Sequence, residues 1–328
     1  MKTIKAAVLC ALAVGLLSSC NDEGGSGKTR DSSPPVKAAA YTNFSGDRAM
    51  EDVKALVAFG PRPSGSAEIE SSRQFIEKRL REAGWETKRQ EFTAETILRG
   101  TIKMANIRAR LPVAGTDTWS RQVMTAVCSH YDTKWFQSTR FVGANDGGSS
   151  TGLLLEVARA AAPVQAFAAR LELVFFDGEE AVTGFTEPRG FGDSRFDGLF
   201  GSRHYAKELR ALPTAQMPKH GIVFDMIGDQ KLEVEFPANG SRRLSGLALK
   251  AAAELGFQRH FRDASEQMVD DHVPLSWVGI EVLDFIDFNS YRDIWHTSAD
   301  TLDKLNPASL EAAGRTGLLF MEKYLAEE

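Results

Sequence analysis

Three acidic side chains directly follow one of the most apolar runs in the sequence. The segment LVFFDGEEAV, residues 173–182, passes from strand-forming residues to Asp177, Glu179 and Glu180. Adjacent carboxylates at the end of a buried run repel one another and lose hydration, so a cation or protons must offset this cost. The segment therefore predicts a metal ligand, an acid/base group, or both.

Further residues able to bind a metal or move protons lie at the ends of other apolar runs. These are His130 and Asp132 after residues 123–128, Asp146 before a predicted helix, Asp225 after residues 221–224, and Trp295 and His296 after residues 279–285. Open α/β sheets bind ligands at the carboxyl ends of their strands, so we expect these side chains to meet. The sequence thus predicts one site for a divalent cation.

The donor types in this set suit zinc. His296 offers an imidazole nitrogen, and Asp146 and Glu180 offer carboxylates, which leaves one position open for water or substrate. Glu179 points away from its neighbour on an extended segment, so it is free to act as a general acid/base. Taken singly, such residues are more often solvated or packing groups, and the prediction depends on their joint placement.

Alternating helical and strand patterns predict an α/β fold that would position these groups. Strands are expected at residues 86–92, 104–111, 123–128, 171–176, 221–224 and 279–285, and helices at 47–59, 66–83, 149–162, 202–212, 242–255 and 307–325. Two irregular stretches, residues 131–147 and 181–201, are too long for simple connections. Loops of that length usually build a binding or catalytic site.

The first forty residues are predicted to lie outside the catalytic domain. Residues 1–19 have the pattern of a secretion signal, because two lysines precede an apolar run too short to span a membrane. The run ends in LSSC, which resembles the lipobox of bacterial lipoproteins, where cleavage precedes a lipidated cysteine. Lipid on Cys20 would anchor the chain to a membrane; the alternative is a plain cleaved signal. Residues 20–40 are expected to form a flexible linker before a single zinc-dependent domain at residues 41–328.

Composition sets the compartment and the partners that we expect. The chain is 43% hydrophobic, carries a net charge of −5 and shows no basic stripe, which argues against nucleic acid as a partner. Removal of Cys10 and lipidation of Cys20 would leave Cys128 alone, so no internal disulfide is expected. We expect a monomeric bacterial lipoprotein on the periplasmic or cell-surface side of its membrane.

Seven segments in order resemble the zinc-dependent glutaminyl cyclases of animal and bacterial type, which share a fold with two-metal zinc aminopeptidases. The segments are SHYDTKWF at 129–136, VGANDGGSS at 142–150, FFDGEEA at 175–181, LFGSRHYA at 199–206, DMIGD at 225–229, DDHVPL at 270–275 and IWHT at 294–297. The resemblance implies a three-layer α/β/α sandwich around a mixed, mostly parallel twisted sheet. It also implies conversion of an N-terminal glutamine of a peptide or protein to pyroglutamate, with loss of ammonia and one zinc ion as cofactor.

The same resemblance assigns roles to individual residues. It implies Asp146, Glu180 and His296 as zinc ligands, Glu179 as the acid/base, Asp225 and Asp270 in a hydrogen-bond network with that glutamate, and Trp295, Phe185 and Tyr291 around the substrate. Phe185 takes the place of the family's pocket tryptophan. Tyr291 stands where an aromatic of the pocket wall is expected.

The main alternative is a two-zinc aminopeptidase that removes N-terminal residues. His130 and Asp225 would then hold a second zinc ion, Asp146 would bridge the two ions, and Glu179 would activate water. Three features favour the cyclase: the segment FFDGEEA, the DDH segment, and the position of Trp295 directly before the histidine ligand. A non-catalytic binding protein would predict a broken ligand set, whereas this set is complete.

Overall fold

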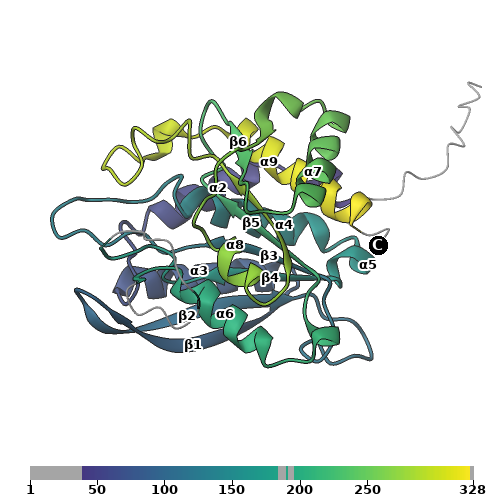
Figure 1. Ribbon diagram of the computed structural model, residues 1–328, viewed down its shortest axis with the longest axis horizontal. Coiled ribbons are helices and arrows are strands. Elements are labelled where there is room, and N and C mark those ends of the chain that lie inside the picture. The colour runs from purple at the N-terminus through teal and green to yellow at the C-terminus, as the bar shows by residue number, and fades with distance from the viewer. Residues whose placement is uncertain (1–38, 184–189, 191–195, 326–328) are drawn as a thin grey trace, which may run out of the picture. The chain divides into compact units, whose positions relative to one another are not determined.

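The computed structural model describes residues 39–183, 190 and 196–325. Its eight described strands are β1 Glu86–Thr96, β2 Gly100–Arg110, β3 Thr125–His130, β4 Leu171–Phe176, β5 His220–Asp225, β6 Val234–Phe236, β7 Phe261–Asp263 and β8 Glu281–Ile286. They form one sheet in the order β1-β2-β4-β3-β5-β8-β6-β7 (Figure 1). The predicted secretion signal, Cys20 and Phe185 lie outside the described residues.

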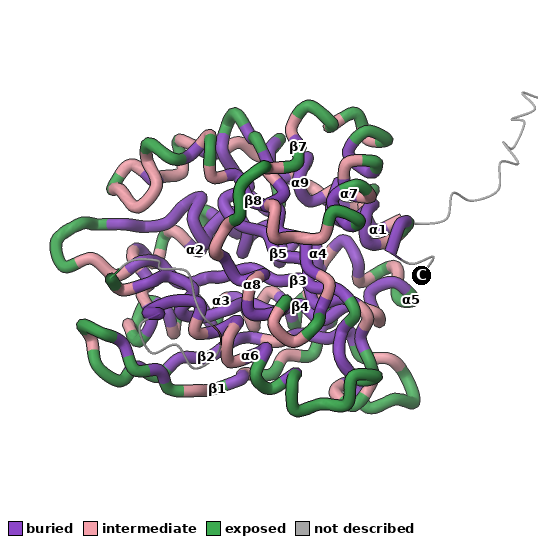
Figure 2. The backbone as a smooth tube through the Cα atoms, viewed as in Figure 1, coloured by how far each residue is buried: buried purple, intermediate pink, exposed green. Residues whose placement is uncertain are grey.

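The centre of the sheet is parallel, and antiparallel pairs flank it on both sides. Strands β4, β3, β5 and β8 run parallel to one another. The β1–β2 hairpin pairs antiparallel with β4 through β2, and β6 pairs antiparallel with β8 but parallel with β7. Every residue of β3, β4 and β5 is buried, as expected for parallel strands covered on both faces (Figure 2). Their carboxyl ends therefore meet at one edge of the sheet.

Helices cover both faces of this sheet. They are α1 Ala40–Asn43, α2 Gly46–Val57, α3 Ala67–Glu82, α4 Gly148–Ala161, α5 Gln165–Ala168, α6 Phe200–Arg210, α7 Arg242–Glu254, α8 His272–Ser276 and α9 Pro307–Leu319. Val127 and Leu173 belong to the core cluster that includes residues of α2, α4, α7 and α9, whereas their chain neighbours Cys128 and Val174 belong to the cluster that includes residues of α6 and α8. This alternation follows from the two-residue period of a strand. The predicted three-layer α/β/α sandwich is confirmed.

The six predicted strands and six predicted helices are all present, with ends shifted by a few residues. Sequence patterns did not predict β6 and β7, because three residues are too few to show a strand period. They also missed α8, a five-residue helix that contains a proline. Among the described residues, no helix is both long enough and apolar enough to cross a bilayer.

Candidate active site

The predicted site residues converge at the carboxyl edge of the parallel strands. His130 ends β3, Asp225 ends β5, and the adjacent pair Glu179 and Glu180 follows β4. A pocket of about 250 Å³ opens there. Its lining includes Asp146, Glu179, Glu180, Asp225, Asp270, Trp295 and His296. Most of the predicted set thus surrounds one cavity.

Asp146, Glu180 and His296 form a compact cluster of donor atoms. Nε2 of His296 lies 3.0 Å from Oε2 of Glu180 and 3.4 Å from Oδ2 of Asp146. The ligand atoms of the three residues all lie within 4.8 Å of one another. Both carboxylate oxygens of Glu180 and Oδ2 of Asp146 are buried and accept no well-aligned hydrogen bond from the described residues. Buried carboxylates without donors fit a divalent cation, so these three residues could hold a metal ion.

The electrostatics of this cluster also favour a cation. Burial and the charge of Asp146 raise the pKa of Glu180 above its ordinary value. Burial alone would lower the pKa of His296, but Glu180 and Asp146 outweigh it and raise that pKa to about 9. Positive charge at this position is therefore strongly stabilised.

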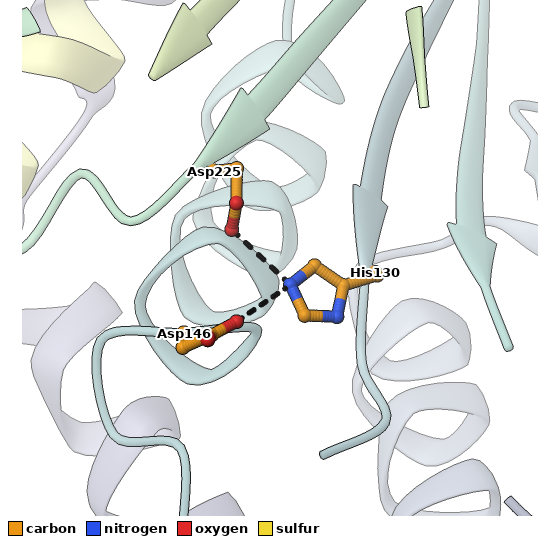
Figure 3. Close-up of side chains that lie close together, drawn as sticks. All are labelled: His130, Asp146 and Asp225. Atoms are coloured by element: carbon orange, nitrogen blue, oxygen red, sulfur yellow. Dashed lines mark hydrogen bonds and ion pairs between the residues drawn. The ribbon is translucent and has the colours of Figure 1, made fainter. Parts of the chain in front are cut away.

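A second group shares Asp146 with the first. Nε2 of His130 lies 3.1 Å from Oδ1 of Asp225 and 3.2 Å from Oδ1 of Asp146, and Figure 3 shows the three side chains pointing toward one another. Burial lowers the pKa of His130, but these carboxylates and Asp132 raise it well above its ordinary value. The group can therefore hold either a proton on His130 or a second cation.

Glu179 is held by a sharp turn after β4. Gly178 adopts a φ of +72°, and a Cβ at this position would approach Sδ of Met104 to 2.6 Å, so only glycine fits. The backbone N–H groups of Glu179 and Glu180 donate to the two oxygens of Asp132, at 3.1 and 3.4 Å. The sequence placed Asp132 at a strand end but did not predict this role.

The surroundings of Glu179 suit proton transfer. Its side chain is 6% exposed and lines the pocket. Burial raises its pKa well above the ordinary value; His130 lowers it, whereas Glu180 and Asp270 raise it further. A carboxyl group whose pKa is moved toward neutrality can both accept and return a proton at physiological pH.

Asp132→Asn tests whether this turn controls the metal cluster. The two N–H groups reach different oxygens of Asp132, so an amide would set its NH2 group against one of them and the turn that carries Glu180 should lose its fixed geometry. We expect metal affinity to fall by about 10–100-fold. Asp117→Asn is a matched control, because Asp117 also accepts two backbone N–H groups but is exposed. Titration with a competing chelator measures both, and equal affinities would contradict the role.

Asp300 supports the cluster from the opposite side. It accepts the backbone N–H groups of Asn145 at 2.8 Å and Asp146 at 3.2 Å, and the Tyr291 hydroxyl donates to it at 2.5 Å. Burial and the charge of Asp146 raise the pKa of Asp300 to about 6. Tyr291, predicted in the pocket wall, is fully buried and is not among the residues that line the described pocket. Asp300 gave no sequence signal beyond its position in a polar loop.

Apolar side chains form part of the pocket wall. Trp295 lies in this wall with Ile286, Phe288 and Met268, and its ring stacks on His296 with centroids 3.7 Å apart. His296 itself has a φ of +58°, a conformation uncommon for a residue with a side chain. The stacked ring and the strained backbone together orient the imidazole toward the two carboxylates.

The hydrogen bonds of Asp225 and Asp270 differ from the predicted network. Asp225 pairs with His130, whereas Oδ1 of Asp270 accepts the backbone N–H of Asp271 at 2.5 Å and its Oδ2 accepts no hydrogen bond from the part of the chain that the structure describes. Both carboxyls line the pocket with Glu179, and Asp270 raises the pKa of Glu179. Asp270 therefore acts on Glu179 through charge, without a direct hydrogen bond among the described side chains.

Several known proteins are similar to this chain in sequence and in fold. The family model of peptidase family M28 matches residues 106–321, which is well over half of the chain. The chain belongs to peptidase family M28. A glutaminyl-peptide cyclotransferase-like protein of Mus musculus is 30% identical over 292 residues, which cover 80% of this chain and 72% of the relative.

Solved structures place this M28 chain beside bacterial glutaminyl cyclases. The cyclase of an Acidobacteriales bacterium superposes with a TM-score of 0.75 at 30% identity, covering 90% of this chain and 99% of the other. The cyclase of Porphyromonas gingivalis gives a TM-score of 0.71 at 26% identity, covering 86% and 99%. The resemblance found in the seven sequence segments is therefore confirmed, and it favours the cyclase branch over the aminopeptidase alternative.

Proposed function

We propose that this M28 protein is a zinc-dependent glutaminyl-peptide cyclotransferase. The observation that carries the proposal is the placement of Glu179, a carboxyl of raised pKa, beside the Asp146, Glu180 and His296 cluster in one small pocket. Cyclases with this fold and 30% identity support it. The proposed substrates are peptides and proteins that begin with glutamine.

The residues divide the chemistry between them. Asp146, Glu180 and His296 would hold the zinc ion, which supplies a Lewis acid that polarises the side-chain amide of the substrate. Glu179 accepts a proton from the α-amine as its nitrogen bonds to the amide carbon, and it returns the proton to the departing nitrogen, which leaves as ammonia. The amine and the amide belong to one substrate residue, so the pocket needs only to fold that residue into a ring-forming conformation.

The shape of the pocket fits this task. A volume of about 250 Å³ matches one bent side chain better than a stretch of polypeptide. The apolar wall of Trp295, Ile286 and Phe288 would cover the methylene groups of glutamine and exclude water. Excluding water favours attack by the substrate's own amine over hydrolysis.

The aminopeptidase alternative rests on the His130, Asp146 and Asp225 group, which could hold a second ion. We propose that zinc occupies only the cluster of Asp146, Glu180 and His296, and that His130 instead pairs directly with Asp146 and Asp225, 3.2 and 3.1 Å away. Purified protein should therefore bind one zinc equivalent tightly, as measured by metal analysis after gel filtration. His130→Gln should keep that equivalent. Two tightly bound equivalents, one of them lost in His130→Gln, would favour the aminopeptidase.

The cyclisation activity of the wild-type protein should depend on its bound zinc. Incubation with a chelator should abolish pyroglutamate formation from a glutamine-leading peptide, and added zinc should restore it. Cyclisation that persists in the fully metal-free protein would contradict the proposed chemistry.

We also propose that the protein is exported and anchored through lipid on Cys20, as the LSSC segment indicates. In a bacterial host, Cys20→Ser should move the protein from the membrane fraction to the soluble fraction, because it removes the acylated thiol. Fractionation with immunoblotting, and metabolic labelling with a fatty acid, measure this directly. Unchanged membrane association and no label in the wild type would contradict the anchor.

A further inference from the structure

A second cavity lies at the amino ends of the parallel strands, away from the proposed zinc site. It has a volume of about 340 Å³ and is lined by residues of β2, of the loop before β3, and of α6 with the segment that follows it. Its lining residue Arg110 follows Ala109, which pairs with Leu173 near the start of β4. This cavity and the proposed active site share no lining residue.

Arg110 fixes the loop that carries two of the lining side chains. Its Nε and Nη2 donate to the buried carboxylate of Glu172, and its Nη1 donates to the backbone oxygens of Trp119 and Arg121 at 3.1 and 2.8 Å. The ring of Trp119 also lies against the guanidinium groups of Arg110 and Arg108, with centroid distances of 5.4 and 5.8 Å. The cavity is therefore held in shape by the protein itself.

Two arginines in the lining keep donors that the fold does not use. Nε and Nη2 of Arg121 donate to backbone oxygens at 3.1 and 2.8 Å, but its buried Nη1 has no partner among the described residues. Arg108 donates only through Nε, to Glu172, and its Nη1 lies 4.0 Å from Oε2 of Glu208, beyond hydrogen-bond distance. N–H groups of both side chains thus remain available for an acceptor.

Tyr205 adds a third donor of the same kind. The side chain is fully buried, lines the cavity and lies 5.3 Å from the guanidinium of Arg108, measured to the ring centroid. Its hydroxyl has no hydrogen-bond partner in the described part of the chain. Burial and the charge of Glu172 raise the pKa of this hydroxyl well above its ordinary value, so it keeps its proton. A buried hydroxyl left without a partner destabilises a fold, whereas a bound acceptor would satisfy it.

The charges around the cavity favour an anion. Its lining contains three arginines and a single acid, Glu208. Glu172 behind the lining neutralises one more arginine, which leaves one positive charge. Burial and the charge of Arg110 lower the pKa of Arg121, so the cavity holds a cation that a negative ligand would stabilise.

We propose that this cavity binds a carboxylate that carries an apolar group. Arg121, Arg108 and Tyr205 would donate to the carboxylate, since planar guanidinium groups match its two oxygens. Trp119 and the 41% exposed Leu212, which also lines the cavity, would cover the apolar group. A carboxylate has the single charge that the cavity offsets, whereas a phosphate monoester carries nearly two. The ligand is either a free organic acid or the C-terminus of a peptide, and the inference is independent of the proposed function.

Isothermal titration of the zinc-loaded wild-type protein with N-acetyl-leucine tests the site. This probe has an apolar side chain and a carboxylate but no free amine that could be cyclised. We expect saturable binding, and affinity at least about 10-fold lower for N-acetyl-leucinamide, which lacks the charge. An N-acetylated peptide ending in leucine distinguishes the two sources. Binding as tight as that of N-acetyl-leucine identifies peptide C-termini, and no binding identifies free acids; either result supports the site.

Two variants place the binding in this cavity. Tyr205→Phe should bind N-acetyl-leucine about 10-fold more weakly, and its Tm without ligand should equal or exceed that of the wild type, because only an unpaired hydroxyl is lost. Arg121→Gln should weaken binding by at least the same factor. The matched control is Arg242→Gln, because Arg242 also donates to a backbone oxygen at 2.8 Å but does not line the cavity. The control should bind as the wild type does.

Four outcomes would overturn the proposal. No saturable binding of N-acetyl-leucine would remove the site, and equal affinity for the acid and the amide would remove carboxylate recognition. Wild-type affinity in both Tyr205→Phe and Arg121→Gln would place the bound acid elsewhere, for example on the zinc ion. Inorganic phosphate that binds as tightly as N-acetyl-leucine would show a general anion site without preference for an apolar carboxylate.

Discussion

Glu179→Gln is expected to lower kcat for cyclisation by about 10²–10⁴-fold, the usual contribution of a general acid/base. Glutamine fills the same space but cannot accept the proton of the attacking amine. The three metal-cluster residues are untouched, so zinc content should equal that of the wild type. KM should change little, because the apolar wall of the pocket remains. Steady-state kinetics and metal analysis on the same preparation measure both properties.

Two results would contradict this assignment. A Glu179→Gln variant with near wild-type kcat would show that another group moves the proton. A variant that had lost its zinc would show that Glu179 is a metal ligand, and the division of labour between the two adjacent glutamates would then be wrong.

Glu180→Gln should lose zinc as well as activity, whereas Glu179→Gln should keep its zinc. Both carboxylate oxygens of Glu180 are buried without well-aligned hydrogen bonds to other described residues, and one lies 3.0 Å from the His296 nitrogen. A neutral amide in this position removes the charge that offsets a divalent cation. Metal analysis should find the variant empty at zinc concentrations that saturate the wild type.

The two glutamates serve as controls for each other. They are adjacent, both are nearly fully buried, and both receive backbone support from Asp132. General damage to the turn would therefore affect the two variants alike. Zinc retained in Glu180→Gln, with kcat close to that of the wild type, would contradict its place in the metal cluster.

Sequence patterns predicted the parts of the site that depend on strand ends. His130, Glu179, Glu180 and Asp225 all follow buried apolar runs, and the parallel centre of the sheet brings such ends to one edge. His296 could be included because imidazole is a common zinc ligand. Local sequence was sufficient for these residues.

Contacts between distant segments could not be predicted in this way. Asp300 reaches the backbone of Asp146 across 154 positions of the chain, and Tyr291 supports it from behind. Each is an acid or aromatic in an ordinary context, so its role appears only when tertiary packing supplies its partner.

Mass spectrometry of two peptides tests the central claim most directly. Wild-type protein with zinc would be incubated with a glutamine-leading peptide and, separately, with the same peptide led by leucine. The proposed function predicts that the first loses the mass of one ammonia with all peptide bonds intact, and that the second is unchanged. Release of the first amino acid from either peptide, without a cyclised product, would contradict it and favour an aminopeptidase.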